Sequence, residues 1–260
     1  MQLIRPEGAR AVTAASIAAQ NGPALAGSRE PISAPSVHTA ERLACIEQAT
    51  KVTDGAFAAL KAALRPGMTE KEAAAIIENH FKANRMGLSF PTISVFGKGT
   101  VDIHGVPSDR RLEQNDIIMV DIGARYEGEG GPWCSDVTRT FFVGEPTARQ
   151  REIWNLVHEA QKLGLAKVRP GATAGDVDKA SRDFLRGKGF SIPHAVGHGV
   201  GRKVHEAPTI SQGNPAKLKV GDVITVEPGV YLSREGFGVR VEDILVVTED
   251  GYRMLSRAPY

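Results

Sequence analysis

The chain carries the stretch LEQNDIIMVD at residues 112–121 and a related stretch, LKVGDVITVE, at residues 218–227. Each is an apolar run with strand character that ends in an acid, which places Asp121 and Glu227 106 positions apart. A carboxylate at the end of a buried strand is costly unless it is paired, hydrogen-bonded or bound to a metal. Two acids at equivalent places therefore predict a shared chemical role.

The duplication extends along the chain. The motif at residues 64–69 is LRPGMT and that at residues 168–173 is VRPGAT, and each follows one helix and precedes another. Asp136 and Glu242 are also 106 positions apart. Because these matches share nearly one offset, we predict two related α+β halves packed about an approximate two-fold axis. Coincidence between two generic helix–loop–strand units is the alternative interpretation.

Hydrophobic periodicity and turn residues outline the elements. Residues 1–37 are rich in Ala, Ser, Pro and Gly and show no sustained periodicity, so we expect a flexible N-terminal leader there. A single folded domain should then occupy residues 38–260. Within it we expect helices at 39–64, 69–84 and 147–166, strands at 92–96, 117–122 and 137–143, and a Gly/Pro turn at 128–132.

Composition narrows the classes of function. The chain has 260 residues and a net charge of +2, and it lacks a Lys/Arg run that would mark a nucleic-acid surface. No apolar stretch reaches the ~18 residues that a membrane span requires, and its 2 cysteines do not make a disulfide framework. We therefore expect a cytoplasmic protein that binds neither nucleic acid nor membrane. A secretory signal around the Ala-rich residues 11–19 is the alternative.

Five side chains predict a metal site: Asp121, Asp136, His198, Glu227 and Glu242. Four acids set in apolar strands require cations, and the histidine of the glycine-rich motif GHGVG offers an imidazole. This oxygen-rich set suits Mn, Fe, Co or Zn. Because four carboxylates carry too much charge for one divalent ion, we expect two ions about 3.5–4 Å apart. For each acid taken alone, an ion pair or a helix cap is the ordinary alternative.

These motifs resemble those of the pita-bread metallopeptidases, the family of methionine aminopeptidases and Xaa-Pro peptidases. The resemblance covers residues 39–260 and makes residues 38–260 the catalytic domain. It implies an α+β fold of two pseudo-two-fold-related halves with a central antiparallel sheet covered by helices. It also implies that Asp136 and Glu242 bridge the two ions. The motifs that carry it are HGVG at 198–201, VHEAP at 204–208, TVEPGVY at 225–231 and VRVED at 239–243.

The resemblance also implies roles in hydrolysis. Glu227 would pass a proton to the leaving amine. His104 and His205, each the first residue of a matched motif, would hydrogen-bond the peptide and the tetrahedral intermediate. His194 and Arg240 would belong to the substrate site. A structural hydrogen bond is the alternative for His194, and for Arg240 the alternatives are steadying a bridging carboxylate or a plain ion pair.

The signals for specificity conflict. The motif HGVP at residues 104–107, and a leader too short to be a large N-terminal domain, resemble methionine aminopeptidases. The motifs DVTRTF at 136–141 and EPGVY at 227–231 resemble Xaa-Pro peptidases, and Val204 stands where methionine aminopeptidases usually place Phe. We favour an Xaa-Pro-type aminopeptidase acting on the N-termini of peptides or nascent proteins. A methionine aminopeptidase is the first alternative, and a metal-free binding module or a non-peptidase C–N hydrolase is the second.

The spacing of the first two acids departs from the family pattern. Asp121 and Asp136 are 15 positions apart, whereas the family usually has 11. A longer hairpin between paired strands would leave the register of both acids intact. The sequence leaves the oligomeric state open.

Overall fold

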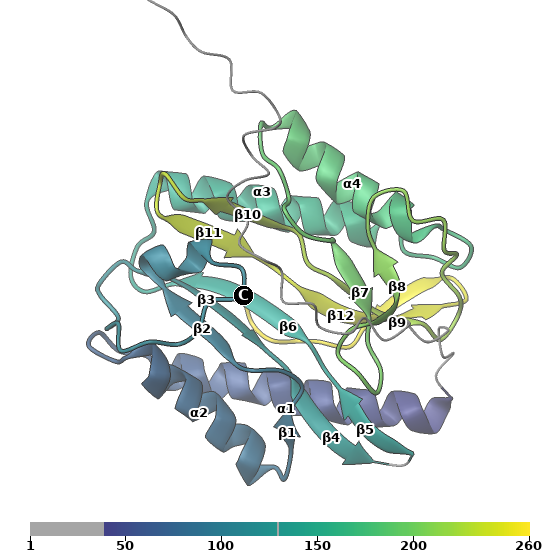
Figure 1. Cartoon of the computed structure of the whole chain (residues 1–260), viewed down its shortest axis with the longest axis horizontal. Coiled ribbons are helices and arrows are strands. Elements are labelled where there is room, and N and C mark those ends of the chain that lie inside the picture. The colour runs from purple at the N-terminus through teal and green to yellow at the C-terminus, as the bar shows by residue number, and fades with distance from the viewer. Residues whose placement is uncertain (1–38, 129) are drawn as a thin grey trace, which may run out of the picture. The chain divides into compact units, whose positions relative to one another are not determined.

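The computed structural model describes residues 39–128 and 130–260, so the predicted leader at residues 1–37 lies outside the described residues (Figure 1). Within these ranges no helix has both the length and the apolar character that crossing a membrane requires. The first half contains α1 (Ala40–Ala63), α2 (Glu70–Ala83), β1 (Gly87–Leu88), β2 (Ile93–Phe96), the 3-10 helix η2 (Gly97–Val101), β3 (Ile117–Ile122), β4 (Ala124–Gly128), β5 (Gly131–Cys134) and β6 (Val137–Phe142).

The second half repeats the order of helix, helix and strands. The predicted duplication is visible in a pair of isolated bridges, Thr69 with Arg111 and Thr173 with Lys217, which close the same loop in each half. The elements of this half are α3 (Ala148–Leu165), α4 (Ala174–Gly187), β7 (Gly197–Gly199), β8 (Glu206–Ile210), β9 (Val223–Val226), β10 (Gly229–Leu232), β11 (Phe237–Arg240), β12 (Asp243–Thr248) and β13 (Gly251–Met254).

Threonines fix where the α-helices begin. The side chains of Thr39, Thr69, Thr147 and Thr173 each accept a hydrogen bond from the backbone N–H three residues further on. In α2, α3 and α4 the residue at that position returns a bond to the cap, which completes a capping box. The helix starts expected from the sequence therefore agree with the structure to within a residue or two.

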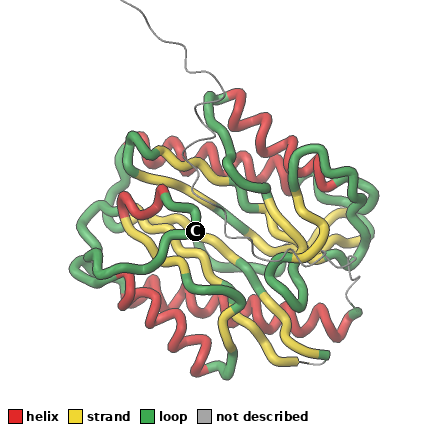
Figure 2. The backbone as a smooth tube through the Cα atoms, in the orientation of Figure 1, coloured by secondary structure: helices red, strands yellow, loops and turns green. Residues whose placement is uncertain are grey.

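The strands that carry the duplicated stretches lie inside their sheets. β3 lies between β2 and β6, and β9 lies between β12 and β7, with antiparallel pairing in both cases. Ile118 belongs to a buried cluster built mainly from the first half, and its counterpart Ile224 belongs to a second cluster built mainly from the second half. In the view of Figures 1 and 2, α1 and α2 lie on one side of the strands and α3 and α4 on the other.

A hairpin separates the two acids of each half. β4 and β5 pair between Asp121 and Asp136, and β10 and β11 pair between Glu227 and Glu242. The unusual spacing of 15 residues is therefore common to both halves. The turn expected at residues 128–132 is narrower than predicted, because Gly128 already pairs with Gly131 in the ladder. Each acid therefore lies at the junction between a hairpin and the neighbouring strand of the larger sheet.

In the first half, Gly123 lies between β3 and β4 and allows the chain to pass from the sheet into the hairpin. A Cβ atom at Gly123 would lie 1.9 Å from the carbonyl oxygen of Ser135, so the two chain segments can meet only because the side chain is missing. Ser135 directly precedes Asp136, and its hydroxyl is hydrogen-bonded to Thr53 of α1 at 2.8 Å. The backbone contact therefore fixes the distance between the strand ends that carry the first two acids.

We predict that Gly123→Ala destabilises the protein by about 1–3 kcal/mol or more, because the added methyl group must displace backbone. The control is Gly187→Ala at the end of α4, where a Cβ meets nothing within 4 Å. That substitution should be neutral or stabilise by up to ~1 kcal/mol. Free energies of unfolding from urea titrations test the pair. Equal stability of the Gly123 variant and the wild type would show that the close approach is not required.

Candidate metal centre

The five predicted ligands converge from both halves. Three overlapping groups have potential ligand atoms within 4.8 Å of one another: Asp121, Asp136 and Glu242; His198, Glu227 and Glu242; and Asp136, His198 and His205. Each acid lies in or beside the end of a strand. Asp121 lies in β3 and Asp136 directly precedes β6. Glu227 directly follows β9, Glu242 lies between β11 and β12, and His198 lies in β7. Strands far apart in the sequence thus build one cluster.

His198 lies between acids of the two halves. Its Nε2 atom is 3.4 Å from Asp136 Oδ2 and 3.3 Å from Glu227 Oε1. Its Nδ1 atom is 3.1 Å from the carbonyl oxygen of Gly199, to which it can donate. When the imidazole is neutral, that bond assigns the proton to Nδ1 and leaves the Nε2 lone pair facing the acids, as a metal ligand requires.

The cluster holds more negative charge than its surroundings balance. Burial, followed by repulsion from Asp121, raises the pKa of Asp136 to about 7. Burial, with repulsion from neighbouring acids, raises the pKa of Glu242 well above its usual value. Burial opposes ionisation of Glu227 too, but the hydrogen bond and charge of His198 lower its pKa. Most of these carboxylates are therefore costly to keep ionised without added cations.

The donor atoms fit divalent metal ions. Asp121 Oδ1 and Asp136 Oδ1 are buried and have no hydrogen-bond partner in the described part of the chain. An acceptor left in that state costs about 1–3 kcal/mol unless something binds it. Carboxylate oxygens with one imidazole nitrogen are the ligand set expected for Mn, Fe, Co or Zn. The residues present therefore suit the cofactors predicted from the sequence.

Arg240 is hydrogen-bonded to the acids of the cluster, directly to Asp121 and through Thr138 to Glu242. Its Nη2 atom donates to Asp121 Oδ2 at 2.6 Å, and its Nε atom donates to the hydroxyl of Thr138 at 3.1 Å. Thr138 in turn donates to Glu242 Oε2 at 2.9 Å. The Arg240 residue is only 2% exposed. Of the roles considered for Arg240, this geometry favours steadying the carboxylates over meeting a substrate.

His194 is joined to Arg240 through a tyrosine. Arg240 Nη1 donates to the Tyr231 hydroxyl at 2.9 Å, and His194 Nε2 lies 3.0 Å from the same oxygen. Since His194 Nδ1 can donate to the Ala195 carbonyl at 2.7 Å, Nε2 is the acceptor for the tyrosine proton. Burial lowers the pKa of His194, in keeping with a neutral ring. No role was predicted for Tyr231, although it ends the motif EPGVY.

The two other predicted histidines, His104 and His205, are exposed, unlike the buried His198. The His205 ring packs edge-on against His198, with ring centroids 4.3 Å apart. Burial lowers the pKa of His205, and the charges of His198 and His104 act in the same direction. His104 lies on an exposed segment between η2 and β3. The structure thus places His104 within electrostatic reach of His205.

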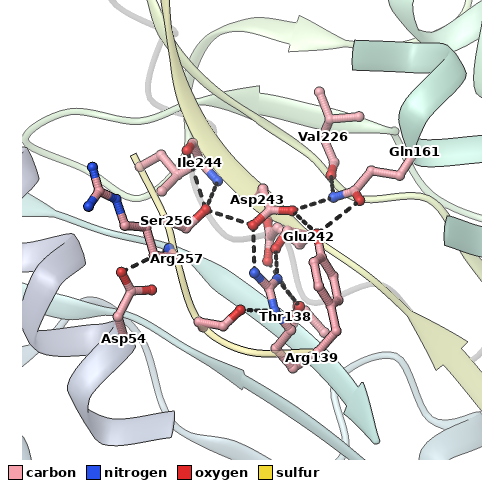
Figure 3. Close-up of polar contacts among 12 residues, drawn as sticks. Asp54, Thr138, Arg139, Gln161, Val226, Glu242, Asp243, Ile244, Ser256 and Arg257 are labelled. Carbon is pink, nitrogen blue, oxygen red and sulfur yellow. Dashed lines mark hydrogen bonds and ion pairs between the residues drawn. The ribbon is translucent and has the colours of Figure 1, made fainter. Parts of the chain in front are cut away.

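A second buried ion pair lies behind Glu242 (Figure 3). Arg139, 1% exposed, donates to Asp243 Oδ1 at 2.6 Å and also to the carbonyl oxygen of Glu242. The Tyr260 ring covers the guanidinium at 4.2 Å, and its hydroxyl donates to Asp243 Oδ2 at 2.5 Å. Because Asp243 is neutralised here, Glu242 alone of the adjacent acids is left for a cation. Sequence reasoning missed this pair, whose signal is the Arg of DVTRTF.

Comparisons with known proteins identify the family of the chain. The model of the metallopeptidase family M24 matches residues 44–249. A Xaa-Pro dipeptidase of Pyrococcus furiosus is 39% identical over 224 residues, which cover 85% of this chain and 63% of the relative. The chain therefore spans less than two thirds of that relative's length.

Solved structures show the same fold. Prolidase from Pyrococcus furiosus matches with a TM-score of 0.82 and 38% identity over 86% of this chain and 66% of its own. An X-Pro aminopeptidase from Thermotoga maritima matches with a TM-score of 0.81 and 37% identity over 86% and 60%. The predicted pita-bread fold of two related α+β halves is confirmed.

We predict opposite effects of Glu242→Gln on the metal-free and metal-loaded protein. Burial and the neighbouring acids raise the folded-state pKa of Glu242, so its ionised form costs free energy on folding, and a neutral amide of the same shape removes that cost. After treatment with a chelator the variant should melt higher than the wild type, with roughly 2–4 °C per kcal/mol gained. With metal added, the wild type should melt higher.

Calorimetric scans with and without chelator measure both effects. Glu249→Gln, in the exposed turn after β12, is the control and should change neither melting temperature. A chelated Glu242→Gln protein that melts below the chelated wild type would contradict the electrostatic argument.

Proposed function

The chain belongs to metallopeptidase family M24, and from this premise we propose that it hydrolyses the bond between an N-terminal residue and a following proline. The observation that carries the proposal is the meeting of five ligand side chains, supplied by both halves, in one buried cluster. Proteins named Xaa-Pro dipeptidase, prolidase and X-Pro aminopeptidase are similar to the chain, which supports the choice of proline substrates. Peptides or nascent protein N-termini would be the substrates.

The metal centre would hold two divalent ions between Asp121, Asp136, His198, Glu227 and Glu242. When bound, such ions supply Lewis acidity that activates water and polarises the scissile carbonyl. The protein contributes the fixed positions of its ligands. Arg240 orients Asp121 directly and orients Glu242 through Thr138, so the carboxylates need not reorganise when substrate arrives.

Three residues of the chain would act on the peptide itself. Glu227 Oε1 lies 3.3 Å from His198 Nε2, and Glu227 would accept a proton from the attacking water and return it to the leaving amine. His205, which packs against His198, would hydrogen-bond the carbonyl oxygen as charge develops on it. His104, within reach of His205, would hold the peptide from the other half.

A methionine aminopeptidase is the second candidate, favoured by the motif HGVP at residues 104–107. The two activities require different pockets for the second residue of the substrate. Peptide length separates a dipeptidase from an aminopeptidase, because only in a dipeptide does the residue that follows the scissile bond carry the free carboxylate. A panel of peptides separates these cases.

We expect chelator-sensitive cleavage of Ala-Pro and Ala-Pro-Xaa peptides in the presence of Mn, Co or Zn, with little cleavage of Met-Ala-Xaa. His198→Ala should lower kcat by at least about 100-fold and reduce bound metal, whereas His80→Ala on α2 should do neither. Mass spectrometry of products and elemental analysis of the protein provide the measurements. Preferential cleavage of Met-Ala-Xaa would transfer the assignment to methionine aminopeptidase, and the absence of any cleavage would exclude a peptidase.

A further inference from the structure

Glu70 is a buried acid outside the metal centre. It begins α2 and is 2% exposed. Oε1 accepts a hydrogen bond from the backbone N–H of Phe96 at 2.7 Å. Oε2 accepts one from the backbone N–H of Ser108 at 2.9 Å and one from its hydroxyl at 2.6 Å. A single carboxylate therefore ties together two points of the chain that are 12 residues apart.

The segment between those two points, residues 96–108, carries His104 and is called the His104 loop below. Its middle is held by β11 of the other half. The Gly238 N–H donates to the Thr100 hydroxyl at 2.8 Å, and Arg240 Nη1 donates to the carbonyl oxygen of Ile103 at 3.2 Å. The residue before His104 is thus bonded to the arginine that orients Asp121. At its ends, Phe96 also pairs with Ile118 of β3 and the Ser108 carbonyl accepts from the Lys71 N–H, while Glu70 is the side chain that bonds to both ends.

The second half shows that the fold does not require this acid. The position equivalent to Glu70, directly after the capping threonine, is Ala174, and α4 still begins with a complete capping box. The segment that carries His205 has a hairpin contact like that of Thr100, with the Cys134 N–H donating to the Gly201 carbonyl at 2.8 Å, but Ala174 stands in place of the acid. An acid buried in only one of two equivalent helix starts points to a local task.

We propose that Glu70 is a positioning residue for His104, holding both ends of the His104 loop so that His104 faces the substrate opposite His205. The inference rests on the proposed peptidase activity. Both carboxylate oxygens accept, so one side chain can serve all three donors at the two ends of the loop. An amide in its place directs its own N–H groups at one of the donors in either orientation.

The test compares Glu70→Gln with Glu72→Gln. Glu72 lies two residues further on. Among the described residues its side chain accepts a hydrogen bond only from the N–H of the cap Thr69, at 2.7 Å, and its counterpart in the capping box of α3 is a Gln. Glu70→Gln should lower kcat/KM for an Ala-Pro peptide by about 10- to 100-fold, with bound metal unchanged. Glu72→Gln should change it less than about twofold. Ser108→Ala, which removes one donor and keeps the acid, provides a milder variant with a smaller loss.

A double-mutant cycle identifies the route. If Glu70 acts through His104, Glu70→Gln should add less than about a twofold loss in the background of His104→Ala. A full additional loss in that background would overturn the assignment, as would unchanged kinetics of the single variant. Hydrogen exchange supplies a readout that is independent of activity. Amides of the His104 loop should exchange faster in Glu70→Gln than in Glu72→Gln.

The exchange measurement also separates this inference from the function on which it rests. If the wild type cleaves no peptide, the proposed function fails, and exchange of the loop still decides whether Glu70 clamps it. If the wild type is active and loop exchange is the same in all variants, the function stands and the positioning role is wrong.

Discussion

Four carboxylates buried in one cluster, with potential ligand atoms within 4.8 Å of one another in overlapping groups, cannot all remain ionised unless cations lie between them. The raised pKa values of Asp136 and Glu242 and the unpartnered oxygens of Asp121 and Asp136 express the same excess of negative charge. The cationic side chains of the protein balance this negative charge only in part. Arg240 bonds directly to one acid, Asp121, and His198 lies between two others, Asp136 and Glu227. The Arg139–Asp243 pair removes one further acid from the balance. The remaining charge matches divalent metal ions.

Duplication is what brings this charge together. Each half supplies two acids, one on either side of a hairpin, and the hairpins also serve the opposite half. Cys134 on β5 bonds to Gly201 ahead of His205, and Gly238 on β11 bonds to Thr100 ahead of His104. The segments that carry the histidines are thus built on the hairpins that separate the acids. A shift of either hairpin would move a ligand and a histidine at once.

The sequence predicted the parts that depend on local pattern. Capping threonines and helical periodicity located the helices, and the spacing of 106 residues located the acids and the two halves. The strands β4 and β5 were not predicted, because Gly128 and Gly131 are typical turn residues and their pairing depends on the rest of the ladder. Hydrogen bonds and ion pairs between residues distant in the sequence were not predicted either. Nothing near Glu70 or Arg139 in the sequence indicates Ser108 or Asp243 as a partner, since each contact is created only when distant segments pack.

The proposed function requires the five ligand side chains to hold a pair of ions. A crystal grown with Mn and measured at the Mn absorption edge tests this directly through anomalous scattering. We expect two peaks about 3.5–4 Å apart, each within bonding distance of these side chains and with Asp136 and Glu242 contacting both. A single peak, or peaks that lie away from the five side chains, would contradict it.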